Sequence, residues 1–341
     1  MIVLASGHDA PPFPTQAGVL SGLVWAFRVD PEGWAEEIPV DRPIELDCEE
    51  GTWLWLHFNL SDTRACRWIA GVAELPPVSR TLLTALNDHQ QFHAAEGCVF
   101  GAIADLVRDL DRDTDRTAFL NFAMSDKLVI TGRRLSLQSV DETRAALRAG
   151  RRLTGPAGLI EMIVENIASG IAKLTDALAE ELDDIEDMVL TDALHDERRR
   201  LGRMRRTAVH LHRQLLGLRA LFNRFRRSEE AGPLLAPAMT RLLQILEGLD
   251  QEVLTLQERA RLLQEEISSK LAEESNRSLH TLTVLTALFL PPTLIAGIFG
   301  MNTGGLPFES TPFGSFWAFV LGVASAGAVF WFLRRAGIIR R

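Results

Sequence analysis

Residues 276–307 read NRSLHTLTVLTALFLPPTLIAGIFGMNTGGLP, and this stretch decides how the chain is built. Residues 278–308 contain no Asp, Glu, Lys or Arg. That length exceeds the roughly 20 residues with which a helix crosses the hydrocarbon core of a bilayer. The run reaches Gly300, Met301 and Asn302 and then continues with glycine and proline. We therefore interpret it as a membrane helix that ends in a short polar segment.

A second uncharged run, residues 310–333, follows after a short connection that carries one charge, Glu309. Glycine and proline in this connection favour a turn, so the two spans are predicted to form a hairpin with both ends on one side of the membrane. Basic residues near membrane helices are retained in the cytoplasm. Such residues flank the open side of the predicted hairpin: Lys270, Arg277, Arg334, Arg335, Arg340 and Arg341. We expect a multi-pass protein of a bacterial-type inner (plasma) membrane, with both termini in the cytoplasm.

The composition agrees with a cytosolic location for the rest of the chain. The formal net charge of -9 disfavours nucleic acid as a partner. Residues 1–16 show no basic segment followed by an apolar core, so no signal peptide is predicted. Cys48, Cys66 and Cys98 are widely spaced, which fits a reducing compartment and provides neither a disulfide framework nor a CxxC zinc pair.

The first part of the chain is predicted to be a mixed α/β domain. Runs of clustered or alternating apolar residues predict strands at 22–29, 52–58, 97–106, 117–124 and 127–131. Helices are predicted at 62–70 and 80–87. Beyond Asp141 the strand signals disappear and helical spacing continues to the end of the chain.

Two adjacent segments of the helical part have opposite charge. Residues 180–197 contain nine acidic residues and no Lys or Arg, whereas residues 198–227 contain eleven arginines and no Asp or Glu. A run this basic is able to bind nucleic acid or anionic lipid. We favour an antiparallel helical hairpin whose two faces attract one another, because the acidic half directly precedes the basic half.

The longest predicted helix covers residues 234–299, which is on the order of 100 Å at the helical rise. Apolar residues recur along it at alternating intervals of four and three, the pattern of a coiled-coil seam. The seam consists of Leu235, Met239, Leu242, Leu246, Leu249, Val253, Leu256, Ala260, Leu263 and Ile267. One helix is therefore expected to run from a cytosolic stalk into the membrane.

The chain is expected to divide into six parts. They are an α/β domain (1–150), a helical hairpin with the stalk (151–275), a pore-lining transmembrane helix (276–300), an extracytoplasmic loop (301–314), a second transmembrane helix (315–334) and a basic cytosolic tail (335–341). The fold class is thus an α+β cytosolic domain with a long helical stalk and two transmembrane helices per chain.

Continuing the four-three spacing into the membrane selects a polar stripe, here called the pore stripe. It consists of Asn276, Leu279, Thr283, Thr286, Leu290, Thr293 and Gly297. One explanation is that threonine hydroxyls bond the carbonyls of their own helix and that small residues permit close packing. The other is a water-filled path, which the terminal Asn302 favours. Two spans cannot enclose such a path, so several copies of the chain must surround it.

Three acidic residues are candidates for attracting cations to this path. Glu258 and Glu265 follow when the stripe is continued back into the stalk, although helix twist accumulates over that distance. Glu309 lies in the predicted outer loop. Each is also explained as an ordinary solvated charge, so these roles are hypotheses.

The histidines give weaker signals. His89 and His93 are four residues apart, as in a helical zinc pair, but Gly97 and the strand after it interrupt such a helix, which favours a surface role. His280 stands beside the predicted pore entrance, where a titrating imidazole is able to couple flux to protons.

Three segments of the long predicted helix and the residues after it resemble a known protein family. Segments 281–284, 289–291 and 296–302 resemble the CorA-type divalent metal ion transporters. The Gly300-Met301-Asn302 tripeptide followed by residues 303–307 looks like the ZntB zinc transporter branch of that family. The order of α/β domain, charged hairpin, stalk and basic tail is similar across the chain. The resemblance implies a funnel-shaped homopentamer.

The resemblance also implies roles for individual residues. The selectivity filter of the family falls on Gly300, Met301 and Asn302. Polar pore rings fall on Asn276 and Thr293, and hydrophobic constrictions fall on Leu279 and Leu290. Some members of the family have methionine at the constrictions, and many magnesium transporters have lysine where this chain has His280, so a magnesium function is weakened.

The chemistry of the filter alone does not select zinc. Asparagine amide oxygens are neutral acceptors that hold the water shell of a hydrated dication without removing it. Zinc sites are ordinarily built from His, Cys or carboxylates, and the filter has none. The zinc prediction therefore rests on the resemblance.

The leading hypothesis is a divalent metal cation transporter that conducts zinc through the central pore of a homopentamer, with proton coupling as an option. Magnesium, cobalt, nickel and cadmium are further candidate cargoes, and no cofactor is expected. A magnesium or cobalt channel of the same family is the alternative. A membrane-anchored coiled-coil scaffold is the alternative from another class. An enzyme is not predicted, because the sequence contains no phosphate-binding glycine loop, nucleophile elbow or HExxH motif.

Overall fold

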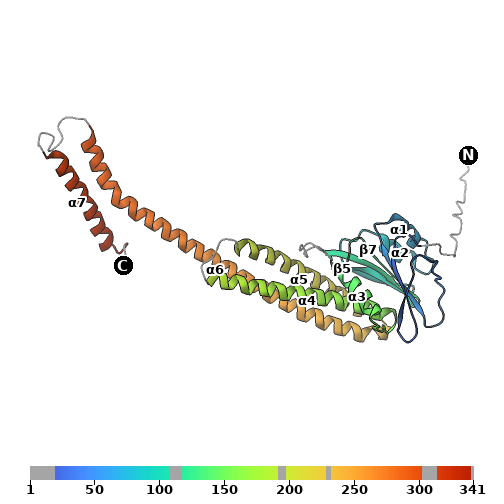
Figure 1. Ribbon diagram of the computed structural model, residues 1–341. Helices are drawn as coiled ribbons and strands as arrows, with labels where there is room; N and C mark the ends of the chain where they lie inside the picture. The colour runs from blue at the N-terminus through green and yellow to red at the C-terminus, as the bar shows by residue number, and fades with distance from the viewer. Residues whose placement is uncertain (1–19, 108–116, 191–196, 228–231, 302–312, 339–341) are drawn as a thin grey trace, which may run out of the picture. The chain divides into compact units, whose positions relative to one another are not determined.

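The computed structural model describes residues 20–107, 117–190, 197–227, 232–301 and 313–338 (Figure 1). These residues form two compact units, Met1–Leu262 and Leu263–Arg341, and the helix α6 (Gly232–Gly300) contributes to both. The first unit contains a seven-stranded sheet with helices on both faces and a bundle of long helices. The second contains the end of α6 and the helix α7 (Gly314–Arg335).

The sheet has the strand order β2-β1-β3-β7-β6-β5-β4, in which only the central pair β3 and β7 is parallel. Its strands are β1 (Leu23–Val29), β2 (Ala35–Ile38), β3 (Trp53–Asn59), β4 (Gln91–Ala95), β5 (Cys98–Leu106), β6 (Thr117–Met124) and β7 (Leu128–Arg133). The five predicted strands are confirmed. The sequence analysis missed β2 and β4, which form the two edges of the sheet.

Helices cover both faces of the sheet because its central strands are apolar on both sides. In β3, Leu54, Leu56 and Phe58 belong to a core cluster that also contains residues of α1 (Thr63–Ala70) and α2 (Pro77–Thr84). On the alternate positions, Trp55 and His57 are also fully buried. The helix α3 (Gln138–Arg148) contacts β2 and β5. The helix predicted at 80–87 is α2, which begins and ends three residues earlier than predicted. Its first residue is Pro77, and proline suits the first helical turn.

Three long helices pack together along the buried seam of α6. They are α4 (Gly155–Leu190), α5 (Glu197–Arg227) and the first part of α6. Every seam residue from Met239 to Ile267 is buried, which confirms the predicted seam over the side chains that the structure describes; Leu235 lies outside them.

Ion pairs join the three helices at their edges. Arg200 of α5 pairs with Glu181 of α4 at 3.2 Å, and Arg259 of α6 pairs with Asp183 of α4 at 2.6 Å. Asp250 of α6 is almost fully buried and accepts hydrogen bonds from Arg219 and His212 of α5. The Arg200–Glu181 pair is thus a direct attraction between the acidic and basic helices, as predicted, whereas the other contacts join each of these helices to α6.

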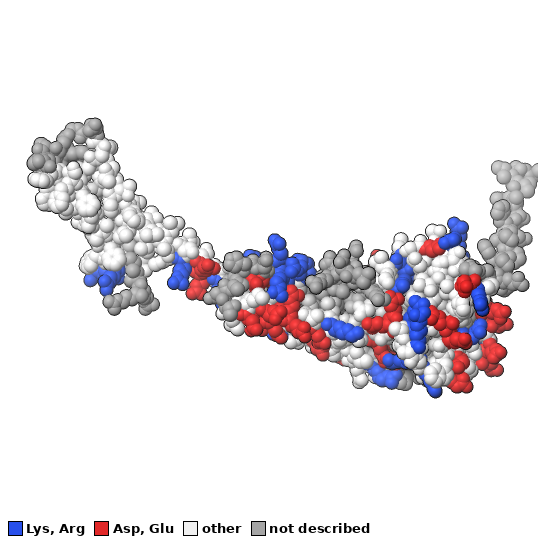
Figure 2. All heavy atoms as spheres, in the orientation of Figure 1, with Lys and Arg blue, Asp and Glu red and all other residues white. Residues whose placement is uncertain are grey.

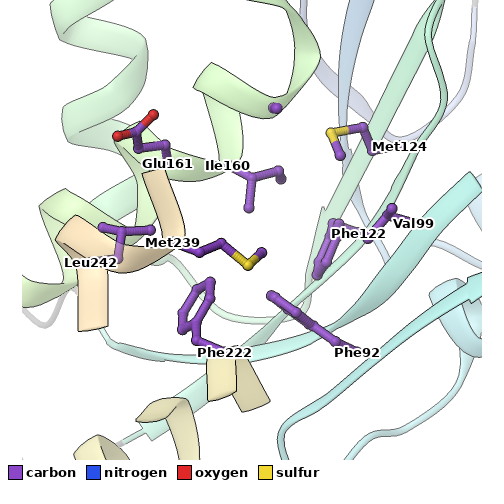
Figure 3. A pocket seen from close by; sticks show the side chains of 10 residues that line it. Phe92, Val99, Phe122, Met124, Ile160, Glu161, Phe222, Met239 and Leu242 are labelled. Atoms are coloured by element: carbon purple, nitrogen blue, oxygen red, sulfur yellow. The ribbon is translucent and has the colours of Figure 1, made fainter. Parts of the chain in front are cut away.

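An apolar pocket lies where the sheet meets the three long helices. In Figure 3, Phe92 and Phe122 of the sheet point toward Phe222 of α5 and Met239 of α6. The carboxylate of Glu161, at the rim, forms an ion pair with Arg241. The rest of the lining is apolar, and these side chains join the helices to the sheet.

The second unit consists of apolar helices. Both α6 and α7 contain a stretch long and apolar enough to cross a membrane. Figure 2 shows this part of the molecule as uncharged on the face drawn, apart from the residues at its ends. Trp317 and Trp331 of α7 are exposed, and the guanidinium of Arg335 lies 5.7 Å from the ring centre of Trp331.

Candidate functional site

The end of α6 has two different faces. Val284, Leu288, Ile295 and Phe299 are half-buried, and a side chain built on Gly322 of α7 would meet Pro292 of the same face at 3.9 Å. These residues therefore form the side of α6 that packs on α7. At the helical repeat of 3.6 residues, the pore stripe falls on the opposite side.

All seven residues of the pore stripe are exposed in the single chain. Leu279 and Leu290 are each about three-fifths exposed, at 58% and 60%. The structure therefore places the predicted stripe on one continuous face of α6 that α7 leaves uncovered.

A shallow groove follows the last four turns of this face. It is lined by Thr286, Phe289, Leu290, Thr293, Leu294, Gly297, Ile298 and Met301. Three residues of the groove, Phe289, Leu294 and Ile298, flank the stripe and were not singled out from the sequence. Their apolar character is the same on every face of a membrane helix, so no sequence signal distinguished them.

The threonine hydroxyls of the stripe donate hydrogen bonds to their own helix. Thr283 bonds the carbonyl of Leu279, Thr286 that of Leu282 and Thr293 that of Phe289, at 2.7 to 2.8 Å. Each hydroxyl hydrogen is thereby used, so each oxygen presents its lone pairs outward. A row of acceptors without donors suits a cation or the hydrogens of its bound water.

The same bond occurs away from the stripe. Thr281 donates to the carbonyl of Arg277 at 2.9 Å, and at the helical repeat it lies toward the α7 side. Back-bonding by itself therefore does not mark a pore. Thr281 is exposed as well, so what distinguishes the three stripe threonines is that they share one side of α6 with the rest of the stripe.

The predicted filter lies at the end of α6. Gly300 is the last residue of the helix, and among the described residues no atom outside its own stretch of helix lies within 4 Å of the position that a side chain would take there. The backbone N–H of Met301 bonds the carbonyl of Ile298 at 3.3 Å, and the Met301 side chain is about half exposed. Asn302 and Glu309 lie outside the described residues.

Both stalk acids, Glu258 and Glu265, are exposed on α6. Glu258 accepts hydrogen bonds from Arg261 three residues later, and this bond lowers the pKa of the Glu258 carboxyl. The nearby arginine also offsets its charge.

His89 and His93 are both exposed, which agrees with the surface role that the sequence analysis favoured over a helical zinc pair. His93 lies on β4 and His89 precedes that strand, where its ring bonds Asp88, so the two do not share a helical face. Among the described residues, no group of three or more His, Cys, Asp or Glu side chains could hold a metal ion.

One buried acid was not predicted from the sequence. Asp105 on β5 accepts hydrogen bonds from the hydroxyl of Ser139 at 2.5 Å and from the N–H of Leu106 at 2.7 Å. Burial is the main cause that raises the pKa of Asp105 to about 7. Ser139 stands in the first turn of α3, whose N-cap residue Leu137 makes no side-chain bond, so Asp105 fills the capping role from a neighbouring strand.

The comparisons with known proteins agree with this architecture. Residues 50–335 match the family model described as CorA-like Mg2+ transporter protein. Because the match covers most of the sequence, the chain belongs to this family, whose members are transporters and not enzymes.

Several relatives match along nearly the whole length. The zinc transport protein ZntB of Pectobacterium atrosepticum is 27% identical over 325 residues, which cover 93% of this chain and 96% of that protein. The divalent cation transporter CmaX of Pseudomonas aeruginosa is 24% identical over 329 residues, which cover 94% and 97%.

Two solved structures share the fold. The full-length CmaX protein superposes with a TM-score of 0.77 at 22% identity, covering 92% of this chain and 97% of that one. The CorA magnesium transporter of Methanocaldococcus jannaschii superposes with a TM-score of 0.75 at 17% identity, covering 93% and 99%.

Proposed function

We propose that this chain is a divalent cation transporter in which several copies place the pore stripe of α6 around one conducting path. The observation that carries the proposal is the exposed row of threonine acceptors on the face of α6 opposite α7. A polar stripe facing lipid would gain nothing, whereas facing other copies it is covered and its acceptors meet the passing ion.

The number of copies that we propose is five, as the resemblance to the CorA-type transporters implies. One chain supplies two candidate membrane helices, and two helices do not enclose a path. A ring of copies related by rotation brings the same stripe residues together at each height. Leu279 and Leu290 then form apolar constrictions, and Asn276 and Thr293 form polar rings.

The filter is proposed at Gly300, Met301 and Asn302. Gly300 leaves the end of the helix unobstructed by a side chain. A ring of Asn302 amide oxygens would then bind the water shell of a dication through neutral acceptors. Weak binding of this kind also allows the ion to leave.

Zinc is the proposed cargo because the relatives named above include a zinc transport protein that aligns along 96% of its length. Magnesium is the alternative, since one solved structure of the same fold is a magnesium transporter. Magnesium gives up its water with reluctance, which suits a filter of neutral oxygens. We further propose that 276–300 and 315–334 cross an inner membrane, with both termini and the arginine-rich tail in the cytoplasm.

The first experiment is cation uptake into proteoliposomes that contain the purified chain. Zinc and magnesium are compared, with and without a pH gradient, and Asn302→Ala is the control. Zinc uptake that depends on Asn302 is expected, and an effect of the pH gradient would add proton coupling. Magnesium uptake alone would establish the alternative cargo, and uptake of neither metal would favour a membrane-anchored scaffold.

A second experiment tests the stripe itself with matched threonines. Thr286→Val and Thr293→Val remove an acceptor from the stripe, whereas Thr281→Val removes the same hydroxyl and the same backbone bond from another face. We expect uptake to fall about tenfold for the stripe variants and to stay near the parent level for Thr281→Val, a difference that corresponds to about 1.4 kcal/mol. Equal effects at all three positions would contradict the proposed path.

A further inference from the structure

The outer faces of α4 and α5 carry charges of opposite sign. On α4 an acidic stripe consists of Asp176, Glu180, Asp184 and Asp187, at intervals of four, four and three residues. On α5 a basic stripe consists of Arg199, Arg203, Arg206 and Arg213, at intervals of four, three and seven. All eight side chains are exposed. Figure 2 shows the acidic and basic groups gathered over α4 and α5.

Each stripe lies opposite the packed side of its own helix. The buried residues of α4 in this region include Leu178, Leu182 and Ile185, which fall about half a turn away from the acidic stripe. Leu201, Met204 and Leu211 stand in the same relation to the basic stripe. The stripes therefore point outward, and the ion pair between Arg200 and Glu181 marks only the border between the two helices.

Each stripe places like charges close together on one side of its helix. Like charges three or four residues apart on a helix repel one another, as do Arg199 and Arg203, or Asp176 and Glu180. All four basic positions are arginine, whose planar guanidinium pairs with carboxylates more specifically than lysine does. A surface that only needed solvation would gain from mixing signs, so the segregation suggests a partner of complementary charge.

The positions of the two stripes along the bundle axis suit a second copy of this chain as the partner. The Arg200–Glu181 pair aligns α4 and α5 so that the acidic stripe and the first three arginines of the basic stripe overlap along the bundle. Rotation about an axis parallel to the helices leaves these heights unchanged. A ring would therefore bring the acidic stripe of one copy to the level of the basic stripe of the next.

We infer that neighbouring copies bind head to tail, with the acidic stripe of α4 on one copy facing the basic stripe of α5 on the next. The inference rests on the assembly of copies in the proposed function and specifies how they recognise one another. Such a contact is heterologous, so it does not stop at a dimer, and it gives a ring when the rotation between neighbouring copies closes. It also excludes like-to-like pairing, which would place acid against acid.

Cross-linking between differently tagged full-length chains tests the arrangement. One chain carries Glu180→Cys and the other Arg203→Cys, and the two are coexpressed, purified in detergent and treated with a short bismaleimide. A cross-linked product that carries both tags is expected. Coexpressed pairs with the same cysteine on both chains should give little product, and the parent with Cys48, Cys66 and Cys98 alone is the blank.

Charge reversal in trans then tests the electrostatic basis. Asp176→Lys and Asp184→Lys in the Glu180→Cys chain should lower the yield several-fold. Arg199→Glu and Arg206→Glu in the Arg203→Cys chain should restore it. The inference is overturned if the unlike pair gives no product, if like pairs give as much, or if the second reversal restores nothing.

The mass of the detergent-purified assembly and cation uptake are measured on the same samples. Uptake by an oligomer that gives no unlike cross-link would overturn this inference and leave the proposed function in place. Unlike cross-links without uptake would overturn the proposed function alone. A monomeric mass would overturn the inference.

Discussion

At the scale of single residues, Asp105 shows how burial changes a carboxyl group. It lies near the end of β5 and caps α3 through Ser139. Because burial disfavours the charged form, the pKa of Asp105 is raised to about 7 from an ordinary value of 3.8. The folded protein therefore holds a proton on Asp105 in a pH range where the unfolded chain has released it.

The expected consequence is a loss of stability as the pH rises. Asp105 stabilises the fold fully below about pH 4, and this contribution is lost as the pH increases to about 7. We expect the free energy of unfolding in urea to fall by about 3 kcal/mol between these limits, at about 1.4 kcal/mol for each pH unit. This free energy is measured by urea titrations of the detergent-solubilised chain at several pH values, followed by far-ultraviolet circular dichroism.

Asp105→Asn removes the titrating group and should flatten this pH dependence. Asp184→Asn is the matched control, because that carboxyl is exposed on α4 and should leave the slope as it was. A slope that persists in Asp105→Asn would assign the pH dependence to another group.

The sequence did not reveal Asp105 for a physical reason. The run at 97–106 predicted a strand, and no local pattern in that run singled out its one acid. The capping bond comes from Ser139, more than thirty residues away, so no local pattern records it. That the seven stripe residues share one exposed face, in contrast, could be predicted, because they lie on one helix at a fixed repeat.

At the scale of elements, the seam of α6 was predicted from periodicity and the edge strands were missed. The sequences of β2, AEEI, and β4, QFHAA, alternate weakly because an edge strand has one neighbour and little buried surface. In the seam, every position of the four-three repeat is apolar over many helical turns. The edge strands β2 and β4 thus depend on tertiary contacts that the local sequence does not record. The helix α6, in contrast, follows from the local spacing of its apolar residues.

The seam also gives a stability prediction. Leu246 is fully buried between the long helices, so Leu246→Ala should lower the free energy of unfolding by about 2 to 5 kcal/mol through lost burial and a cavity. Leu262→Ala is the matched control on the same helix, since Leu262 is 52% exposed and should change stability by about 0.5 kcal/mol or less. Similar losses at both positions would contradict the packing described for α6.

At the scale of the whole molecule, a shared path differs from separate paths in how variants combine. Parent chains are coexpressed with Asn302→Ala chains in known ratios, and cation uptake is measured in proteoliposomes. In a ring of five with equal amounts of both chains, about 3% of rings contain parent copies only. Uptake should therefore fall well below half of the parent value.

Separate paths through each chain would give a linear decrease with the fraction of variant. The parent mixed with Thr281→Val serves as the control, because neither geometry predicts a loss there. If uptake decreases linearly with the fraction of Asn302→Ala chains, the hypothesis of a shared path is contradicted, whereas the hypothesis of cation transport is not.

The tryptophans of the chain fall into two groups, those of the sheet unit and those of α7, whose fluorescence can be distinguished. The sequence has seven tryptophans and no tyrosine, so its near-ultraviolet emission comes from tryptophan alone. Five of them belong to the sheet unit, where Trp25 and Trp55 are fully buried, and two, Trp317 and Trp331, stand exposed on α7. Brominated lipids would quench the emission of the α7 pair only, so the unlabelled protein carries its own fluorescent report on insertion into a bilayer.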